Sequence, residues 1–214
     1  MHNSVKNLLL IQDQIKKINP NTKVIAVSKT FNDKAIMPLV TYGHVDFAEN
    51  KVQEAINKWS DIKSKNHKIK LHMIGRLQTN KVKYVVSLFD YIHSLDNLKL
   101  AQKISYEQKK INRKLKIFIQ VNIGNEIQKS GIKIADLKNF YLKCIHDFEL
   151  DIVGLMCIPP MSNDTELYFS KMLELNKFIG LNELSMGMSA DYLEAVKFGS
   201  SFVRVGSKIF GSRA

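Results

Sequence analysis

The chain alternates short apolar segments with segments of helical periodicity along its whole length, and this alternation constrains the fold more than any other feature. Eight segments are short and mostly apolar, as expected for strands that are buried on both faces of a parallel sheet. They cover residues 24–28, 45–48, 71–75, 91–94, 115–123, 152–158, 183–187 and 201–205. Eight such strands separated by helices favour a closed barrel over an open doubly wound sheet.

Helical patterns precede and separate these strands. The first helix is expected to run from Val5 to Ile18 and to stop before Pro20, because proline ends a helix. The seven later helical segments lie after residue 32 and over residues 52–59, 79–88, 96–112, 134–148, 163–178 and 190–198, with Asp96 as an expected N-cap. Only residues 206–214 follow the last strand, so we expect the first helix to occupy the place of an eighth. The sequence predicts an α/β protein, a single (β/α)8 TIM-type barrel domain over residues 1–214.

Composition limits the classes of partner. The 214 residues can bury a core without disulfides or a structural metal. The net charge of +12 comes from 28 lysines and only 4 arginines, whereas recognition of phosphates and bases in nucleic acids depends strongly on the planar arginine fork. The composition therefore gives little support to a basic nucleic-acid-binding module, and we expect no nucleic-acid partner.

The chain shows no signal for export or membrane insertion. The N-terminal apolar run is too brief for a signal peptide, and no apolar stretch is long enough to cross a bilayer. Cys144 and Cys157 are interpreted as small buried residues in a reducing compartment, with a chance pairing as the alternative. Neither the cysteines nor the histidines have metal-ligand spacing. We expect a cytoplasmic protein with no metal and no membrane partner.

Polar residues gather at the ends of the predicted strands. In barrels of this kind ligands bind at the C-terminal ends of the strands, where the loops can vary. The residues at those ends are Lys29, Glu49, Asn50, Arg76, Gln78, Ser94, Asn122, Ser189, Arg204, Gly206 and Ser207. This coincidence predicts a binding site at that face of the barrel.

Lys29 is the most informative of these residues, because it directly follows the apolar strand at 24–28. A buried amine must pair with an acid, lose its proton or react with a carbonyl group. A neutral lysine can form a Schiff base with an aldehyde such as that of pyridoxal phosphate. The simpler alternative is that the side chain extends from the strand end into solvent.

The ends of the last two strands carry groups suited to an anion. Gly206 and Ser207 follow the eighth strand, and Ser189 follows the seventh, where barrels often bind phosphate through backbone amides. A tight turn with a helix cap is the alternative interpretation. Together with Lys29, these residues suggest one ligand with an aldehyde at one end and a phosphate at the other.

Several segments, taken in order, resemble the family of pyridoxal-phosphate-binding homeostasis proteins. The matching segments are VIAVSKT (24–30), FAENKVQE (47–54), LHMIGRLQTNK (71–81), IHSLD (92–96), QVNI (120–123), KSG (129–131), GLM (154–156), LSMGMSAD (184–191) and VRVGS (203–207). They span almost the entire chain. Ala48, Lys51 and Arg76 depart from the usual pattern, and the first two lie at one edge of the expected pocket.

The resemblance implies a barrel of the alanine-racemase type that holds pyridoxal 5'-phosphate (PLP) as a Schiff base on Lys29. It also implies that Arg204 faces the pyridine nitrogen and that Asn50 lies beside the ring. The residues that it implies for the phosphate are Ser189, Gly206 and Ser207. The implied role is in vitamin B6 homeostasis without established catalytic turnover. We expect a monomer whose partners are PLP and the PLP-dependent apoenzymes that receive it.

A slow PLP-dependent racemase or transaminase that uses Lys29 is the alternative. It requires a second proton donor, for which Tyr42, Tyr84 and His72 are the candidates, although each is more simply a core or surface residue. His72 and His93 are interpreted as hydrogen-bonded histidines of the barrel. Four residues of the family pattern receive no role from the sequence: Asn80, Lys81, Lys129 and Ser130.

Overall fold

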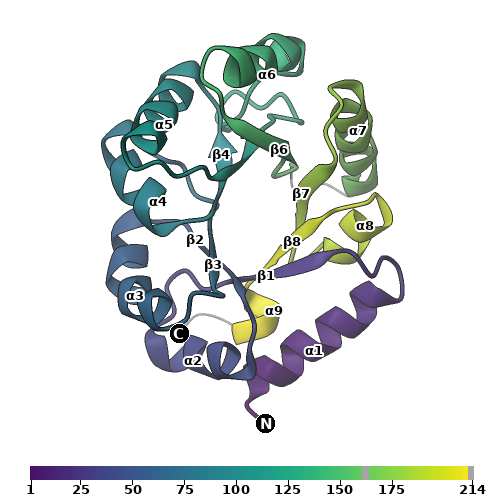
Figure 1. Ribbon diagram of the computed structural model, residues 1–214. Coiled ribbons are helices and arrows are strands. Elements are labelled where there is room, and N and C mark those ends of the chain that lie inside the picture. Colours follow the sequence, from purple (N-terminus) through teal and green to yellow (C-terminus); the bar gives the residue numbers. More distant parts are fainter. Residues whose placement is uncertain (161–163, 212–214) are drawn as a thin grey trace.

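The structure is a computed structural model that describes residues 1–160 and 164–211. Within these residues, eight parallel strands close into a barrel in the order of the sequence (Figure 1). The strands are β1 (Lys23–Val27), β2 (Asp46–Glu49), β3 (Lys70–Met73), β4 (Tyr91–Leu95), β5 (Lys116–Gln120), β6 (Asp151–Met156), β7 (Glu183–Met188) and β8 (Phe202–Val205). β8 pairs with β1 and closes the sheet. The predicted fold class is confirmed.

Helices surround the barrel (Figure 1). They are α1 (Asn3–Lys16), α2 (Asp33–Tyr42), α3 (Val52–Lys65), α4 (Val82–Leu88), α5 (Leu98–Lys110), α6 (Leu137–His146), α7 (Thr165–Phe178), α8 (Tyr192–Lys197) and the short α9 (Ser207–Phe210). Single 3-10 turns precede α4 and α6, at Thr79–Lys81 and Ile134–Asp136. α1 packs against α2, α8 and α9 and completes the ring of helices. The expectation that the N-terminal helix takes the place of an eighth is confirmed.

Some predicted boundaries differ from the structure. The N-cap of α5 is Asn97 rather than Asp96, because the Asn97 side chain accepts the Leu100 N–H at 2.9 Å. β5 stops before the predicted end at residue 123, because Val121 instead forms an isolated bridge to Ile132 in the following loop. α7 begins at Thr165, and the predicted helix start at Asn163 lies outside the described residues.

Side-chain alternation divides the core into two regions. In β1, Ile25 and Val27 face the barrel interior, while Val24 and Ala26 pack toward the surrounding helices. The interior also contains Ala48, Tyr91, Phe118, Met156 and Phe202. Because Lys29 is two residues beyond Val27, the same alternation directs its side chain toward the mouth of the barrel.

Both cysteines are free and buried, as predicted. Burial raises the pKa of each thiol to about 12. Within residues 1–160 and 164–211, no helix has the length and apolar character needed to cross a membrane. The same part of the chain contains no group of histidine, cysteine and acidic side chains that could hold a metal ion.

Candidate functional site

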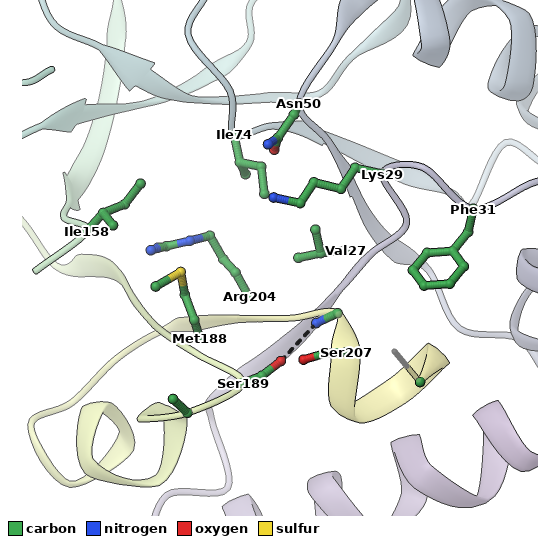
Figure 2. A pocket seen from close by; sticks show the side chains of 13 residues that line it. Val27, Lys29, Phe31, Asn50, Ile74, Ile158, Met188, Ser189, Arg204 and Ser207 are labelled. Atoms are coloured by element: carbon green, nitrogen blue, oxygen red, sulfur yellow. Dashed lines mark hydrogen bonds between the residues drawn. The ribbon is translucent and has the colours of Figure 1, made fainter. Parts of the chain in front are cut away.

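A pocket of about 320 Å³ opens at the C-terminal ends of the barrel strands. All six of the predicted cofactor-binding residues line it: Lys29, Asn50, Ser189, Arg204, Gly206 and Ser207. Figure 2 shows Lys29 and Asn50 at one edge, Ser189 and Ser207 at the opposite edge, and Val27 and Arg204 between them. The structure therefore brings together residues that lie far apart in the sequence, such as Lys29 and Ser207.

The backbone on both sides of Lys29 is held by a buried ion cluster that joins β1, β2 and α3. Lys58 donates to the Ser28 carbonyl at 2.8 Å and to Glu49 at 2.9 Å. The Ser28 hydroxyl also donates to Glu49, at 2.8 Å. The Thr30 N–H donates to Glu54, which accepts a further hydrogen bond from Lys58. Lys29 is thus placed between two anchored residues.

Thr30 adopts a left-handed backbone conformation, with φ of 69°. A threonine there is strained, because its branched side chain crowds the backbone at positive φ. The Thr30 N–H donates to Glu54, and this hydrogen bond helps to hold the turn. At this turn the chain leaves the direction of β1, immediately after Lys29.

Glu49 lies at the centre of this cluster and is fully buried. Burial raises the pKa of its carboxyl group, against the opposing effects of hydrogen bonds from Trp59, Lys58 and Ser28. One carboxylate oxygen accepts all three of those hydrogen bonds, while the other has no partner within the described part of the chain. The sequence placed Glu49 at the mouth, but gave no signal for its pairing with Lys58.

Glycine and serine form the opposite edge of the pocket. The Gly206 N–H donates to the Ser189 hydroxyl at 3.4 Å, which joins the ends of β7 and β8 (Figure 2). A Cβ atom at Gly206 would lie only 3.2 Å from the Val27 carbonyl oxygen, so glycine lets β8 end close to β1. Ser207 begins α9, and the first amides of a helix have no intrahelical carbonyl to bind.

Arg204 forms the floor of the pocket and is only 4% exposed. Its guanidinium donates to the Ser185 hydroxyl at 2.7 Å and to the Cys157 carbonyl at 2.8 Å. Burial lowers the pKa of Arg204, although a guanidinium stays protonated in proteins. The pocket therefore has a permanently cationic floor.

Apolar side chains complete the lining. Val27 and Ile74 come from the ends of β1 and β3, while Ile158 and Met188 come from the ends of β6 and β7. The polar pattern of the sequence did not identify Ile74 or Ile158 as lining residues. Apolar residues at strand ends carry no signal that separates a ligand surface from the core.

The other polar residues at the strand ends have different positions. Ser94 donates to the Gly75 carbonyl at 2.6 Å, and Asn122 bonds to the backbone of Glu126. Arg76 and Gln78 are exposed. None of these four polar residues from the strand ends lines the pocket described above.

The three candidates for a second proton donor also lie away from the pocket. Tyr42 and Tyr84 lie on α2 and α4 and are 49% and 40% exposed. His72 is fully buried inside the barrel and bonds to His93 and Asp46. The interpretation of His72 and His93 as hydrogen-bonded barrel residues is confirmed. Among the residues that the structure describes, none of the three candidates lines the pocket.

Known proteins similar to this chain include one matching family and several relatives that share one name. Residues 5–214 match the family described as alanine racemase, N-terminal domain. The pyridoxal phosphate homeostasis protein of Haemophilus influenzae is 37% identical, over 97% of this chain and 94% of that protein. The protein of the same name from Aquifex aeolicus is 36% identical, over 89% of this chain and 87% of its own length.

Solved structures include a relative with a ligand. The structure of PipY from Synechococcus elongatus with PLP bound is 31% identical, has a TM-score of 0.88, and matches 97% of this chain and 100% of that one. An alanine racemase of Clostridium difficile shares the fold at 15% identity with a TM-score of 0.76, and the match covers 99% of this chain but 57% of the racemase. The chain thus belongs to the alanine racemase N-terminal domain family and, within it, to the pyridoxal phosphate homeostasis proteins.

Proposed function

We propose that this protein binds pyridoxal 5'-phosphate in the mouth pocket and acts in intracellular PLP homeostasis, with the cofactor held as a Schiff base on Lys29. The observation that carries the proposal is the presence of Lys29 and the Ser189, Gly206 and Ser207 edge in one pocket. An amine at one end and amide and hydroxyl donors at the other match a ligand with an aldehyde and a phosphate. The relatives' names and the PLP-bound PipY structure support the same ligand.

The pocket suits PLP in its volume and its lining. Its volume of about 320 Å³ suits a small cofactor, because ligand pockets range from about 300 to 1,000 Å³. Gly206 leaves the phosphate edge without a side chain, where a Cβ would already be close to Val27. Apolar residues such as Val27, Ile74 and Met188 provide surfaces for a planar ring. Cationic Arg204 complements an anionic ligand.

Each residue has a distinct task in the proposal. Lys29 would supply the amine for the aldehyde carbon, with water as the leaving group, and Asn50 would lie beside the ring. The phosphate would accept hydrogen bonds from its edge of the pocket, made by Ser189, Gly206 and Ser207. Arg204 would face the ring nitrogen.

The residues of the pocket favour binding over turnover. When bound, PLP supplies an electrophilic carbon and an electron-withdrawing ring, and the ring withdraws electrons most strongly when its nitrogen is protonated. Arg204 cannot supply that proton, because its guanidinium only donates hydrogen bonds and keeps its charge. No tyrosine, histidine or acidic side chain lines the pocket among residues 1–160 and 164–211, so a second base beside Lys29 is lacking there.

We therefore favour a carrier or regulator of PLP. In this proposal the protein is a monomer with one domain over residues 1–214, works in the cytoplasm, and passes the cofactor to PLP-dependent apoenzymes. The exposed Ser207 and the half-exposed Lys29 leave the ligand accessible from the open end of the barrel, as a transfer role requires.

A spectroscopic titration with PLP tests the proposal. The wild type and the Lys51→Ala variant are expected to develop the visible absorbance of a lysine Schiff base, whereas Lys29→Ala is not. Lys51 is a matched control, because it is an exposed lysine next to Asn50 and does not line the pocket. The same absorbance in Lys29→Ala would refute the proposed site.

The alternative is a slow amino-acid racemase or transaminase, which is favoured only by the fold shared with alanine racemases. Proton NMR of alanine in deuterated buffer separates the two functions. A carrier is expected to exchange the α-hydrogen no faster than free PLP does. Faster exchange that is lost in Lys29→Ala would establish the enzyme instead.

A further inference from the structure

Five polar side chains form a hydrogen-bonded line through the barrel interior, from the pocket floor toward the opposite end. Arg204 donates to the Ser185 hydroxyl at 2.7 Å, and that hydroxyl lies 2.8 Å from His93 Nδ1. His93 Nε2 lies 2.9 Å from His72 Nδ1, and His72 Nε2 lies 3.1 Å from Asp46 Oδ1. Each of the five residues is at most 7% exposed. We call this set the barrel chain.

The two ends of the barrel chain determine the direction of every hydrogen bond in it. Arg204 can only donate, and an ionised Asp46 can only accept. His72 must then carry its hydrogen on Nε2, so its Nδ1 accepts from His93 Nε2. His93 Nδ1 is left as an acceptor for the Ser185 hydroxyl, whose oxygen accepts from Arg204. All donors therefore point from Arg204 toward Asp46.

The charge states agree with this direction. Burial lowers the pKa of His72 and lowers that of His93 well below its usual value, so both rings are neutral near neutral pH. Burial is the largest single effect on Asp46 and opposes its ionisation, but the hydrogen bond with His72 and the electrostatic effects of nearby groups such as Lys70 together lower the pKa of the carboxyl group. Two neutral imidazoles between a cation and an anion have one hydrogen-bonding arrangement that satisfies every atom in the line.

Aromatic packing prevents the rings from turning. His72 is stacked on Tyr91, with centroids 4.3 Å apart and planes 9° apart. His93 is stacked on Phe118 at 4.4 Å and 18°. Phe202 packs against both histidines. A ring flip would displace these neighbours, since packed interiors leave little free space.

The barrel chain connects Arg204 to the Asp46 carboxylate through intervening hydrogen bonds, without a direct salt bridge. Among the described residues, no carboxylate forms a salt bridge with Arg204, and its two acceptors, Ser185 and Cys157, are neutral. Two of its five N–H groups are bonded to these acceptors. The barrel chain thus fixes one side of the guanidinium while another part of the side chain lines the pocket.

We propose that Asp46, His72, His93 and Ser185 are positioning residues that hold Arg204 in one orientation, with its remaining donors directed at the ring of the bound ligand. The effect on ligand binding rests on the proposed function above. The hydrogen-bond direction does not, because it follows from groups within the chain itself.

Nitrogen-15 NMR of the imidazole rings tests the direction without any ligand. For both His72 and His93 the expected spectrum shows hydrogen on Nε2 and none on Nδ1. The His93→Gln variant, which lacks one ring, assigns the two sets of signals. A protonated Nδ1 on either ring would overturn the proposal.

The second part of the test measures PLP binding by Ser185→Ala and His93→Phe, which interrupt the barrel chain. Both are expected to bind PLP about tenfold more weakly, the scale of one hydrogen bond to a charged group, and to shift the visible absorbance. His93→Gln is expected to restore binding, because its amide can accept from Ser185 and donate to His72. Ser200→Ala is the matched control, since Ser200 is equally buried but, among the described residues, its hydroxyl bonds only to backbone groups.

The outcomes separate the two proposals. If the wild type does not bind PLP, the proposed function fails, while the NMR spectrum still tests the barrel chain. If the NMR pattern is as expected but Ser185→Ala and His93→Phe bind PLP like the wild type, the positioning role is wrong and the proposed function stands. Loss of binding that His93→Gln does not restore would also contradict the positioning role.

Discussion

Replacement of Lys58 by methionine should test how the backbone around Lys29 is held. Lys58 is 5% exposed and its partner Glu49 is fully buried. The substitution keeps the aliphatic side chain but removes the hydrogen bonds to Ser28, Glu49 and Glu54. Glu49 would then remain as a buried carboxylate bonded only to Trp59 and Ser28.

The expected loss is about 3–5 kcal/mol of unfolding free energy, which is typical when one partner of a buried pair is removed. The double variant Lys58→Met/Glu49→Gln should lose less than the single variant, because no unpaired charge remains. A coupling of at least about 1 kcal/mol is expected between the two sites. Lys17→Met is the control, since the Lys17–Asp13 pair is mostly exposed and should contribute little.

Urea unfolding monitored by circular dichroism measures these differences. The pH dependence provides a second check on the same variant. Because the pKa of Glu49 is raised in the folded state, the folded protein takes up its proton first as the pH falls, so the deficit of Lys58→Met should shrink under mildly acidic conditions. A single variant that loses less than about 1 kcal/mol, or a double variant that loses more than the single one, would refute the reasoning.

Three further predictions concern the barrel interior, the phosphate edge and the thiols. Because burial lowers the pKa of His93 in the folded state, the unfolded state takes up the proton first, and the unfolding free energy should fall as the pH drops through about 6.5. His93→Gln should remove at most about 1.4 kcal/mol of the loss between about pH 7.5 and 5.5, as measured by urea unfolding at each pH, and the same pH dependence of the unfolding free energy as in the wild type would contradict this. Gly206→Ala should weaken PLP binding about tenfold in a spectroscopic titration, because its Cβ would lie 3.2 Å from the Val27 carbonyl oxygen and shift the Gly206 backbone, at the cost of about one hydrogen bond to a charged group; unchanged affinity would contradict a role of the Gly206 backbone in holding the ligand. Cys144 and Cys157 should react with a thiol reagent only in denaturant, because burial raises both thiol pKa values to about 12; labelling of the folded protein would disprove their burial.

Most of the fold could be predicted because the strand pattern is local. Most barrel strands are short, mostly apolar runs, and the position of Lys29 directly after the first of them could be read from the sequence. The structure adds that Lys29 continues the inward face of Ile25 and Val27. The ends of helices were less predictable where two adjacent polar residues could each serve as the N-cap. Asp96 and Asn97 both suit an N-cap, and only the structure shows that Asn97 accepts the Leu100 N–H.

The site could be predicted only in part, since several contacts exist only after the barrel closes. All six residues that were predicted from the strand ends line the pocket, but the prediction did not include Ile74 or Ile158. The pairing of Lys58 with Glu49 depends on how α3 packs on the sheet. The barrel chain joins β2, β3, β4, β7 and β8, and no local pattern reveals contacts between residues so far apart in sequence.

Borohydride reduction of the PLP-loaded wild type, followed by peptide mapping, tests the central claim most directly. Reduction makes a Schiff base permanent, so the modified residue can be identified by mass spectrometry. We predict one phosphopyridoxyl group per chain, attached to Lys29 in the peptide that follows β1. Modification of a different lysine, or none despite bound PLP, would contradict the proposed site.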